Sequence, residues 1–158
     1  RVAAERPDAR LEIVGAYRTA PPIDFAAAIE GRGLTGRARL RDWVDDATLA
    51  DLYRQASVFV FLSRYEGFGF TPLEAMAHGL VPVVLDTPVA REVYGDAAWR
   101  VAEGPALTGS VAGAIGALLD DQALVRRYRA AARPVLASYR WADAARRVFA
   151  CLEEAAGG

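Results

Sequence analysis

The sequence predicts an α/β fold, in which a Rossmann-like, doubly wound and mostly parallel sheet is followed by C-terminal helices. Two observations support this prediction. Short apolar runs alternate with helix-like segments, and strands that alternate with helices form βαβ units with right-handed crossovers and a parallel sheet. From residue 106 onward the pattern is helical throughout. Sheets of this kind bind ligands beyond the carboxyl ends of their strands.

The expected strands are short and apolar. Residues 11–15 end in glycine and are expected to form a buried strand. Residues 57–62 form an unbroken β-branched and aromatic run, as expected of a strand that is covered on both faces. Three more strands are expected at 38–44, at 81–85, where the strand is again buried, and at 99–102, where it is a short edge strand.

Helices are expected between and after these strands. Asp45 or Asp46 can cap a helix in which Leu49, Leu52 and Tyr53 share one face at three- and four-residue spacing. The other helices are expected at 24–31, 72–77, 106–119, 122–138 and 142–155.

Composition narrows the classes of function. The 158 residues are 53% hydrophobic and 25% charged, so a single globular domain over 1–158 is expected. A formal net charge of −1 gives no electrostatic reason to expect nucleic-acid binding. The one cysteine, Cys151, cannot form an intramolecular disulfide and fits a reducing compartment. The one histidine, His78, is too far from Cys151 in the sequence to build a metal site with it.

The segment from Glu66 to Glu74 is the strongest candidate for chemistry. A loop with two glycines, 66–70, lies between the carboxyl end of an expected strand and the amino end of an expected helix. The first turn of a helix has free backbone N–H groups and a partial positive charge, so this junction suits a phosphate. Thr71 is expected to cap the helix and Pro72 to occupy its first position.

A purely structural interpretation accounts for the same residues. Thr71 and Glu74 have the spacing of a capping box, in which the glutamate reaches back to the cap and needs no ligand. The glycines fit an ordinary tight turn, and Glu66 fits a solvated loop carboxylate.

The wider pattern nevertheless resembles a known family. Glu66 and Glu74 have seven residues between them, joined by Gly-Phe-Gly-Phe, and this resembles the E-x7-E signature of the family 4 retaining glycosyltransferases. These enzymes have two Rossmann-like domains, the GT-B architecture. The resemblance extends from about residue 11 to residue 139 and includes the segments 48–60, 73–79, 81–84, 91–93 and 95–98.

The resemblance implies a role for each residue of the signature. Glu66, the catalytic candidate, matches a carboxylate that contacts the donor sugar, and Glu74 matches one that holds the nucleotide ribose. A carboxylate suits a diol because it can accept two hydrogen bonds. The donor sugar and diphosphate would lie beside Gly67, Phe68, Gly69, Phe70 and Thr71.

The nucleotide base is implied to lie near the segment 41–44, with Arg41, Trp43 and Val44 as candidates. Residue pattern alone leaves open whether Trp43 faces the base or the core, and the core is the expectation.

The implied reaction is transfer of a hexosyl group from a nucleoside diphosphate sugar to an acceptor hydroxyl, with retention at the anomeric carbon. No cofactor and no metal are implied. The implied partners are the sugar nucleotide and a saccharide or lipid-linked acceptor, in cell-envelope polysaccharide synthesis. A cytoplasmic location is implied, with the inner face of the membrane as the site of any peripheral contact.

The family pattern is incomplete here. The family's first strand in this domain, the Arg and Lys pair that grips the diphosphate, and the N-terminal acceptor domain have no counterpart in the chain, which opens as if within a helix. The chain is therefore expected to be the donor-binding part of a longer protein and to be inactive alone. A non-catalytic nucleotide-sugar-binding module is the alternative. A response receiver and a dinucleotide oxidoreductase fit poorly, the latter because no Gly-x-Gly-x-x-Gly follows a strand with an acid about twenty residues further on.

Overall fold

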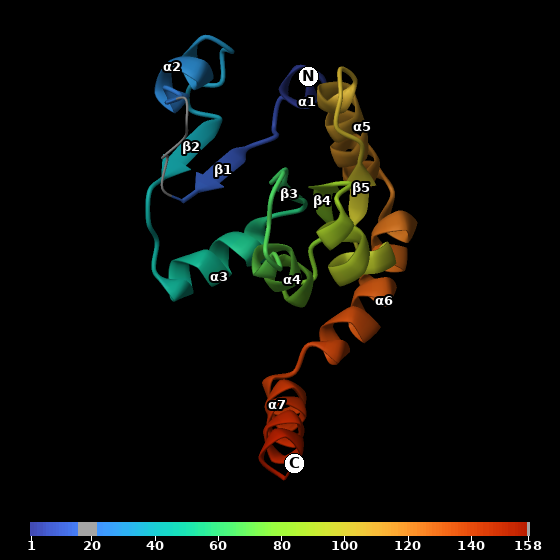
Figure 1. Ribbon diagram of the computed structural model, residues 1–158. Coiled ribbons are helices and arrows are strands. Elements are labelled where there is room, and N and C mark those ends of the chain that lie inside the picture. Colours follow the sequence, from blue (N-terminus) through green and yellow to red (C-terminus); the bar gives the residue numbers. More distant parts are fainter. Residues whose placement is uncertain (16–21, 158) are drawn as a thin grey trace. The chain divides into compact units, whose positions relative to one another are not determined.

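The computed structural model describes residues 1–15 and 22–157, and the chain divides into two compact units, 1–56 and 57–158 (Figure 1). Every strand pairing among the described residues is parallel, and helices follow the last strand. The α/β prediction with a parallel sheet and C-terminal helices is confirmed. The pairings form a two-stranded sheet in the first unit and a three-stranded sheet in the second.

The described residues of the first unit form two strands and three helices. Strand β1 (Leu11–Val14) pairs with β2 (Ala38–Arg41), with Leu11 opposite Ala38 and Val14 opposite Arg41. Asp24 and Asp45 cap α2 and α3 by accepting the N–H groups of Ala27, at 2.9 Å, and Thr48, at 2.7 Å. The helices are α1 (Val2–Glu5), α2 (Phe25–Glu30) and α3 (Asp46–Gln55).

Strand β1 lies where it was expected but is not buried. Leu11 is 48% exposed and Val14 is 39% exposed, so the expectation of a buried strand is wrong. The physical reason is the size of the sheet: β1 pairs with β2 alone among the described strands, and two strands offer little cover.

The second unit is built around strand β4 (Pro82–Leu85). Strands β3 (Phe59–Phe61) and β5 (Trp99–Val101) pair with it on either side, with Phe61 opposite Val84 and Leu85 opposite Val101. The helical elements are α4 (Phe70–Ala77), the π-helical turn η1 (Ala90–Tyr94), the 3₁₀ turn η2 (Gly95–Ala97), α5 (Leu107–Asp120), α6 (Gln122–Ser138) and α7 (Trp141–Ala156).

Both faces of β4 are covered, as a doubly wound sheet requires. Successive side chains of a strand point to opposite faces. Val84 therefore enters a cluster with Leu73 and Met76 of α4, while Val83 enters a second cluster with Leu118 of α5. All four residues of β4 are buried.

Strand β3 is less covered than its unbroken apolar run predicts. Val60 is 39% exposed, and Leu62, just after the strand, is 37% exposed. Strand β3 pairs only with β4 among the described strands, so it is an edge of its sheet and not a central strand. The expectation of cover on both faces is wrong for β3, and the expectation of a buried strand is confirmed for β4.

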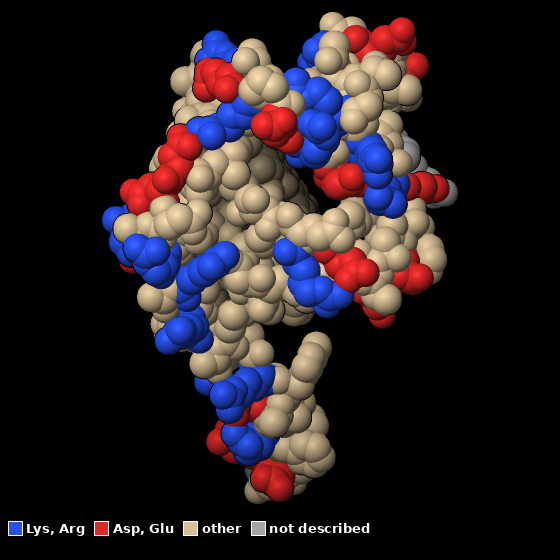
Figure 2. All heavy atoms as spheres, turned by 180° about the vertical axis from the view of Figure 1, so that it is seen from behind, with Lys and Arg blue, Asp and Glu red and all other residues tan. Residues whose placement is uncertain are grey.

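The C-terminal helices lie close to their expected bounds, and α6 spans 122–138 as expected. Helix α7, at the bottom of Figure 2, carries acidic and basic side chains next to apolar ones. Its apolar residues Trp141, Phe149 and Leu152 are 83%, 68% and 60% exposed. Every helix in the described part of the chain is too short or too polar to cross a bilayer.

Candidate functional site

The structure brings the sequence-predicted site residues from Glu66 to Glu74 together in the second unit, where β3 leads into α4. The loop leaves the carboxyl end of β3, and α4 begins at Phe70. Ligands of parallel sheets bind beyond such strand ends, and the amino end of the helix adds a partial positive charge there.

The helix begins two residues earlier than expected. Gly69, not Thr71, is the residue that precedes it, and Gly69 makes no side-chain cap hydrogen bond. Thr71 and Pro72 are therefore the second and third residues of the helix, and the capping box predicted for Thr71 and Glu74 is wrong. Pro72 is still accommodated because first-turn N–H groups have no partner within a helix.

The early start depends on the backbone of Gly69. Its φ of +80° lies in the left-handed region, which glycine enters without the steric cost that a Cβ imposes. A Cβ at this position would also lie 2.1 Å from the Tyr94 hydroxyl oxygen, whereas a Cβ at Gly67 would meet nothing within 4 Å. Gly69 is thus required by its surroundings, and Gly67 is not.

Tyr94 fills the space beside Gly69. Its side chain is buried, and its hydroxyl donates to the Gly69 carbonyl oxygen at 2.8 Å. Burial, and then the nearby carboxylate of Glu66 and the hydroxyl of Tyr139, raise the pKa of Tyr94 to about 12. The hydroxyl is therefore protonated at neutral pH and can donate this hydrogen bond.

The two phenylalanines of the loop differ in position. Phe68 packs on the cluster that contains Tyr94, and its ring lies edge-on to Tyr139 with centroids 5.1 Å apart. The ring of Phe70 contacts that of Phe68, with centroids 4.7 Å apart, but Phe70 remains 56% exposed. Phe68 therefore anchors the loop, and Phe70 presents a ring to solvent at the start of α4.

A small hollow lies at the ends of β3 and β4, and its lining includes Ser63, Glu66, Thr87 and Tyr94. Its volume is about 10 Å³, which is the room of about one water molecule. A sugar would therefore have to lie over its mouth, where Glu66 is half-buried and Gly67 is exposed.

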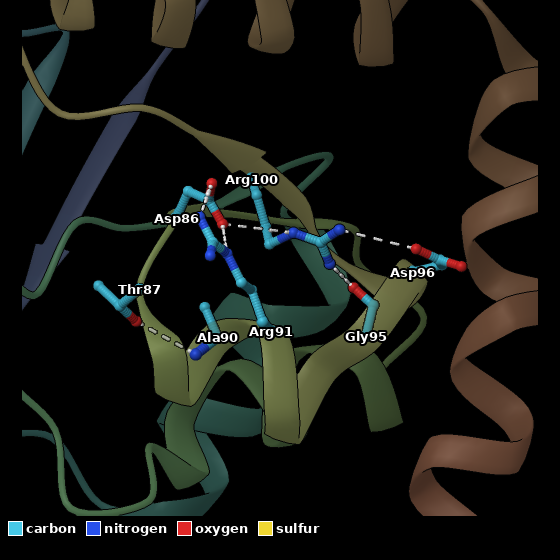
Figure 3. A network of polar contacts seen from close by, with 7 residues as sticks. All are labelled: Asp86, Thr87, Ala90, Arg91, Gly95, Asp96 and Arg100. Atoms are coloured by element: carbon cyan, nitrogen blue, oxygen red, sulfur yellow. Dashed lines mark hydrogen bonds and ion pairs between the residues drawn. The ribbon is translucent and has the colours of Figure 1, made fainter.

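Sequence reasoning did not find the polar network that follows β4 (Figure 3). Arg91 donates to both carboxylate oxygens of Asp86 at 2.8 Å, and this holds the pKa of Asp86 below its usual range. Arg100 lies 3.6 Å from Asp86 and 3.7 Å from Asp96, and it donates to the Gly95 carbonyl. Arg91 follows Asp86 by five positions, so only the turn between them could have suggested the pair.

The three base-binding candidates lie in the first unit. Arg41 ends β2 and pairs with Glu12 at 2.7 Å, and Val44 is half-buried. Trp43 follows the strand and is 81% exposed, so its expected place in the core is wrong. Strand β2 ends at Arg41, and Trp43 therefore lies in the connection to α3, outside the sheet.

The cations that flank the loop and β4 are matched with carboxylates. Arg64, just after β3, pairs with Glu103 at 2.5 Å, and Arg91 pairs with Asp86. Within the described residues, no three side chains of His, Cys, Asp or Glu gather so that they could hold a metal ion. Backbone N–H groups at the amino end of α4 are further donors that this unit can offer to an anion.

Curated relatives match half of the chain or more. A GDP-mannose:cellobiosyl-diphosphopolyprenol alpha-mannosyltransferase of Xanthomonas campestris is 40% identical over 82 residues, which is 52% of this chain and 22% of that protein. The D-inositol 3-phosphate glycosyltransferase 1 of Catenulispora acidiphila is 35% identical over 147 residues, which is 88% of this chain and 33% of that protein. The chain thus spans about a fifth to a third of the length of these relatives.

Solved structures share the fold. A sucrose-phosphate synthase from Thermosynechococcus elongatus superimposes on 99% of this chain and 41% of its own, with a TM-score of 0.81 and 23% identity. The pneumococcal O-GlcNAc transferase GtfA in complex with UDP and GlcNAc covers 97% of this chain and 31% of its own, with a TM-score of 0.79 and 19% identity. At these identities the likeness establishes the fold alone.

The family model described as "Glycosyl transferases group 1" matches residues 1–121, which is more than half of the chain. The α/β architecture agrees with this match. The chain belongs to the group 1 glycosyl transferases and has the fold of the C-terminal domain of a GT-B glycosyltransferase.

Proposed function

We propose that the chain is the donor-binding half of a retaining glycosyltransferase, which transfers a hexosyl group from a nucleoside diphosphate sugar to an acceptor hydroxyl. The observation that carries this proposal is the pair Glu66 and Glu74 on either side of one loop-to-helix junction. The family supports the class of reaction, and the junction is the proposed place of the donor.

The diphosphate is proposed to lie at the amino end of α4. Backbone N–H groups of its first turn point out of the helix, and fixed dipoles of this kind stabilise the charge that develops on a leaving diphosphate. The exposed Gly67 lets the donor approach the loop backbone closely. No metal is required in this arrangement.

The two glutamates are proposed to contact different parts of the donor. Glu66 lies in the lining of the hollow beyond β3 and contacts hydroxyls of the sugar. Glu74 is exposed on the second turn of α4 and accepts hydrogen bonds from the ribose diol. Arg41, Trp43 and Val44 are proposed to contact the base, and the exposed ring of Trp43 can stack on it.

The acceptor and the cellular setting are proposed from the relatives. The mannosyltransferase of Xanthomonas campestris is named for a diphosphopolyprenol acceptor, so we propose a saccharide or lipid-linked acceptor, cell-envelope polysaccharide synthesis, and action at the cytoplasmic face of the membrane. Because the chain spans only part of its relatives, residues 1–158 alone are proposed to be inactive in sugar transfer. A transfer assay on the isolated chain tests this, and robust turnover would refute it.

The test of the main proposal is a calorimetric screen of UDP, GDP, ADP and their sugar conjugates against the full-length protein. Glu74→Gln should weaken binding of the nucleoside diphosphate and of its nucleoside alike, with little change in melting temperature. Glu66→Gln should weaken only the sugar conjugate. Glu154→Gln, an exposed change on α7, is the matched control. A protein that binds none of these compounds is not a donor-binding enzyme, and one that binds without transfer is a non-catalytic binding module.

A further inference from the structure

The contact between Tyr94 and Gly69 joins two elements that are far apart in the sequence. The Tyr94 hydroxyl donates to the Gly69 carbonyl at 2.8 Å, and it occupies the place where any side chain on residue 69 would begin. The hydroxyl and the glycine are therefore matched in shape as well as in hydrogen bonding.

Tyr94 is held in place at both ends of its segment. On the N-terminal side of Tyr94, Arg91 donates to both carboxylate oxygens of Asp86, and the Ala90 N–H donates to the Thr87 hydroxyl at 3.1 Å (Figure 3). After it, Arg100 donates to the Gly95 carbonyl. The ring is 2% exposed within the cluster of α4, β4 and α6 residues. The hydroxyl therefore has one well-determined position.

The planarity of the peptide bond couples the position of the Tyr94 hydroxyl to the orientation of an N–H group in the candidate site. The Gly69 carbonyl and the Phe70 N–H belong to one planar, trans peptide unit, so they point in opposite directions and turn together. A hydroxyl that fixes the carbonyl also fixes the N–H. That N–H is the first of α4, at the end of the helix where the diphosphate is proposed to lie.

We propose that Tyr94 is a positioning residue of the donor site: its hydroxyl orients the Gly69–Phe70 peptide so that the Phe70 N–H points at the donor diphosphate. Tyr94 itself contacts no part of the donor. This inference rests on the proposed donor-binding function. It assigns to Tyr94 a role that phenylalanine, which has the same ring without the hydroxyl, cannot perform.

The experiment compares Tyr94→Phe with the wild-type full-length protein by calorimetry. The probes are the member of the set UDP, GDP and ADP that the wild-type protein binds best and the nucleoside of that compound. Tyr94→Phe should weaken diphosphate binding by about five- to tenfold and change nucleoside binding less than about twofold, because only the diphosphate needs the oriented amide. Tyr139→Phe removes a neighbouring hydroxyl that donates to the Val93 carbonyl at 3.4 Å and should change neither affinity.

A merely structural role for Tyr94 would give another result. It would change both affinities by the same factor, or lower the melting temperature with no change in either, and both outcomes overturn the proposal. If the wild-type protein binds the nucleoside diphosphate and Tyr94→Phe binds it equally well, the positioning role fails and the donor site stands. If the wild-type protein binds none of the three diphosphates, the donor-binding function fails and the inference fails with it.

A second measurement tests the contact independently of ligand. Gly69→Ala places a Cβ against the Tyr94 hydroxyl, and removing that oxygen leaves the nearest ring atom at 3.3 Å. Gly69→Ala should therefore lower the melting temperature less in the Tyr94→Phe background than in the wild type. Equal losses in the two backgrounds would contradict the contact.

Discussion

The two units of the chain differ in how much of their structure is buried. Residues 57–158 contain both hydrophobic clusters, which lie on the two faces of β4. Among the described residues 1–56, the buried hydrophobic side chains are Ala38 and Tyr53 alone. Both units have parallel strands and capped helices, so regular secondary structure does not distinguish them. The difference teaches that cover on both faces of β4, and not regular secondary structure, gives the second unit its core.

This difference bears on the candidate site. The loop from Glu66 to Glu74 is attached to the well-packed unit, where Tyr94 and Phe68 anchor it. The base-binding candidates Arg41, Trp43 and Val44 belong to the unit with little core. Free energies of local opening follow burial, so the loop from Glu66 to Glu74 is expected to be more preorganised than the segment 41–44.

The largest expected effect is the loss of a core side chain from the second unit. Leu118 is 2% exposed, so Leu118→Ala should lower the free energy of unfolding by about 3 kcal/mol, from lost burial and the cavity left behind. The matched change in the first unit is Leu11→Ala, at a side chain that is 48% exposed, and it should cost less than about 1 kcal/mol. Urea unfolding followed by circular dichroism measures both changes, and equal losses would contradict the comparison.

The next largest expected effect is a difference in stability loss between alanine substitutions of the two loop glycines. Gly69→Ala combines a φ of +80° with a clash at the Tyr94 hydroxyl, and it should cost about 2 kcal/mol. Gly67→Ala has open space around its Cβ and should cost less than about 1 kcal/mol. The same unfolding measurement decides between them, and a larger loss at Gly67 would show that the loop is anchored elsewhere.

A smaller effect on stability is expected when a helix cap is removed, and it should differ between the two units. Asp121 accepts the N–H groups of Ala123 and Leu124 at 2.8 and 2.9 Å, and Asp121→Ala should lower global stability by about 1 kcal/mol. Asp24 caps the short α2, where Asp24→Ala should instead accelerate hydrogen exchange within α2 and leave global unfolding nearly unchanged. Asn at either position keeps the cap and is the control. A global loss from Asp24→Ala would mean that the units unfold together.

The smallest expected effect is a change in stability at acidic pH. The paired Arg91 guanidinium lowers the pKa of Asp86 from its usual 3.8, so the stabilisation is complete above about pH 3.8 and is lost as the pH falls through the lower pKa of the folded protein. The difference in melting temperature between wild type and Asp86→Asn should be constant from about pH 7 to about pH 4 and shrink below that. In the first unit, the side-chain and backbone hydrogen bonds of Thr48 lower the pKa of Asp45, and Asp45→Asn should follow the same course. A difference that grows in acid would reverse the assigned sign.

Local patterns predicted the elements well where the interactions are local. Asp45 accepts an N–H three residues further on, and Asp121 and Tyr139 flank a helix with the expected bounds of 122–138. The prediction failed at α4 because its start depends on Tyr94, which lies 25 residues from Gly69 in the sequence. A capping pattern at Thr71 and Glu74 cannot register a distant hydroxyl that stabilises an earlier start.

Burial was the property that apolar pattern predicted least well. Residues 57–62 and 81–85 look alike as apolar runs, but β4 is buried throughout and β3 is an edge. A run of apolar residues indicates that a strand can be buried. Whether the strand is buried depends on its neighbours in the sheet. Trp43 was misplaced for the same reason, because the strand that was expected to include it ends at Arg41.

The sequence by itself determined the alternation of strands and helices, the cap at Asp45, and the placement of Glu66 and Glu74 around one junction. These depend on residues that are close along the chain. The tertiary structure alone decided that β4 is the covered strand, that α4 begins directly after Gly69, and that Tyr94 fixes the peptide there. Those outcomes depend on which distant side chains fill the same space, and no local pattern carries that information.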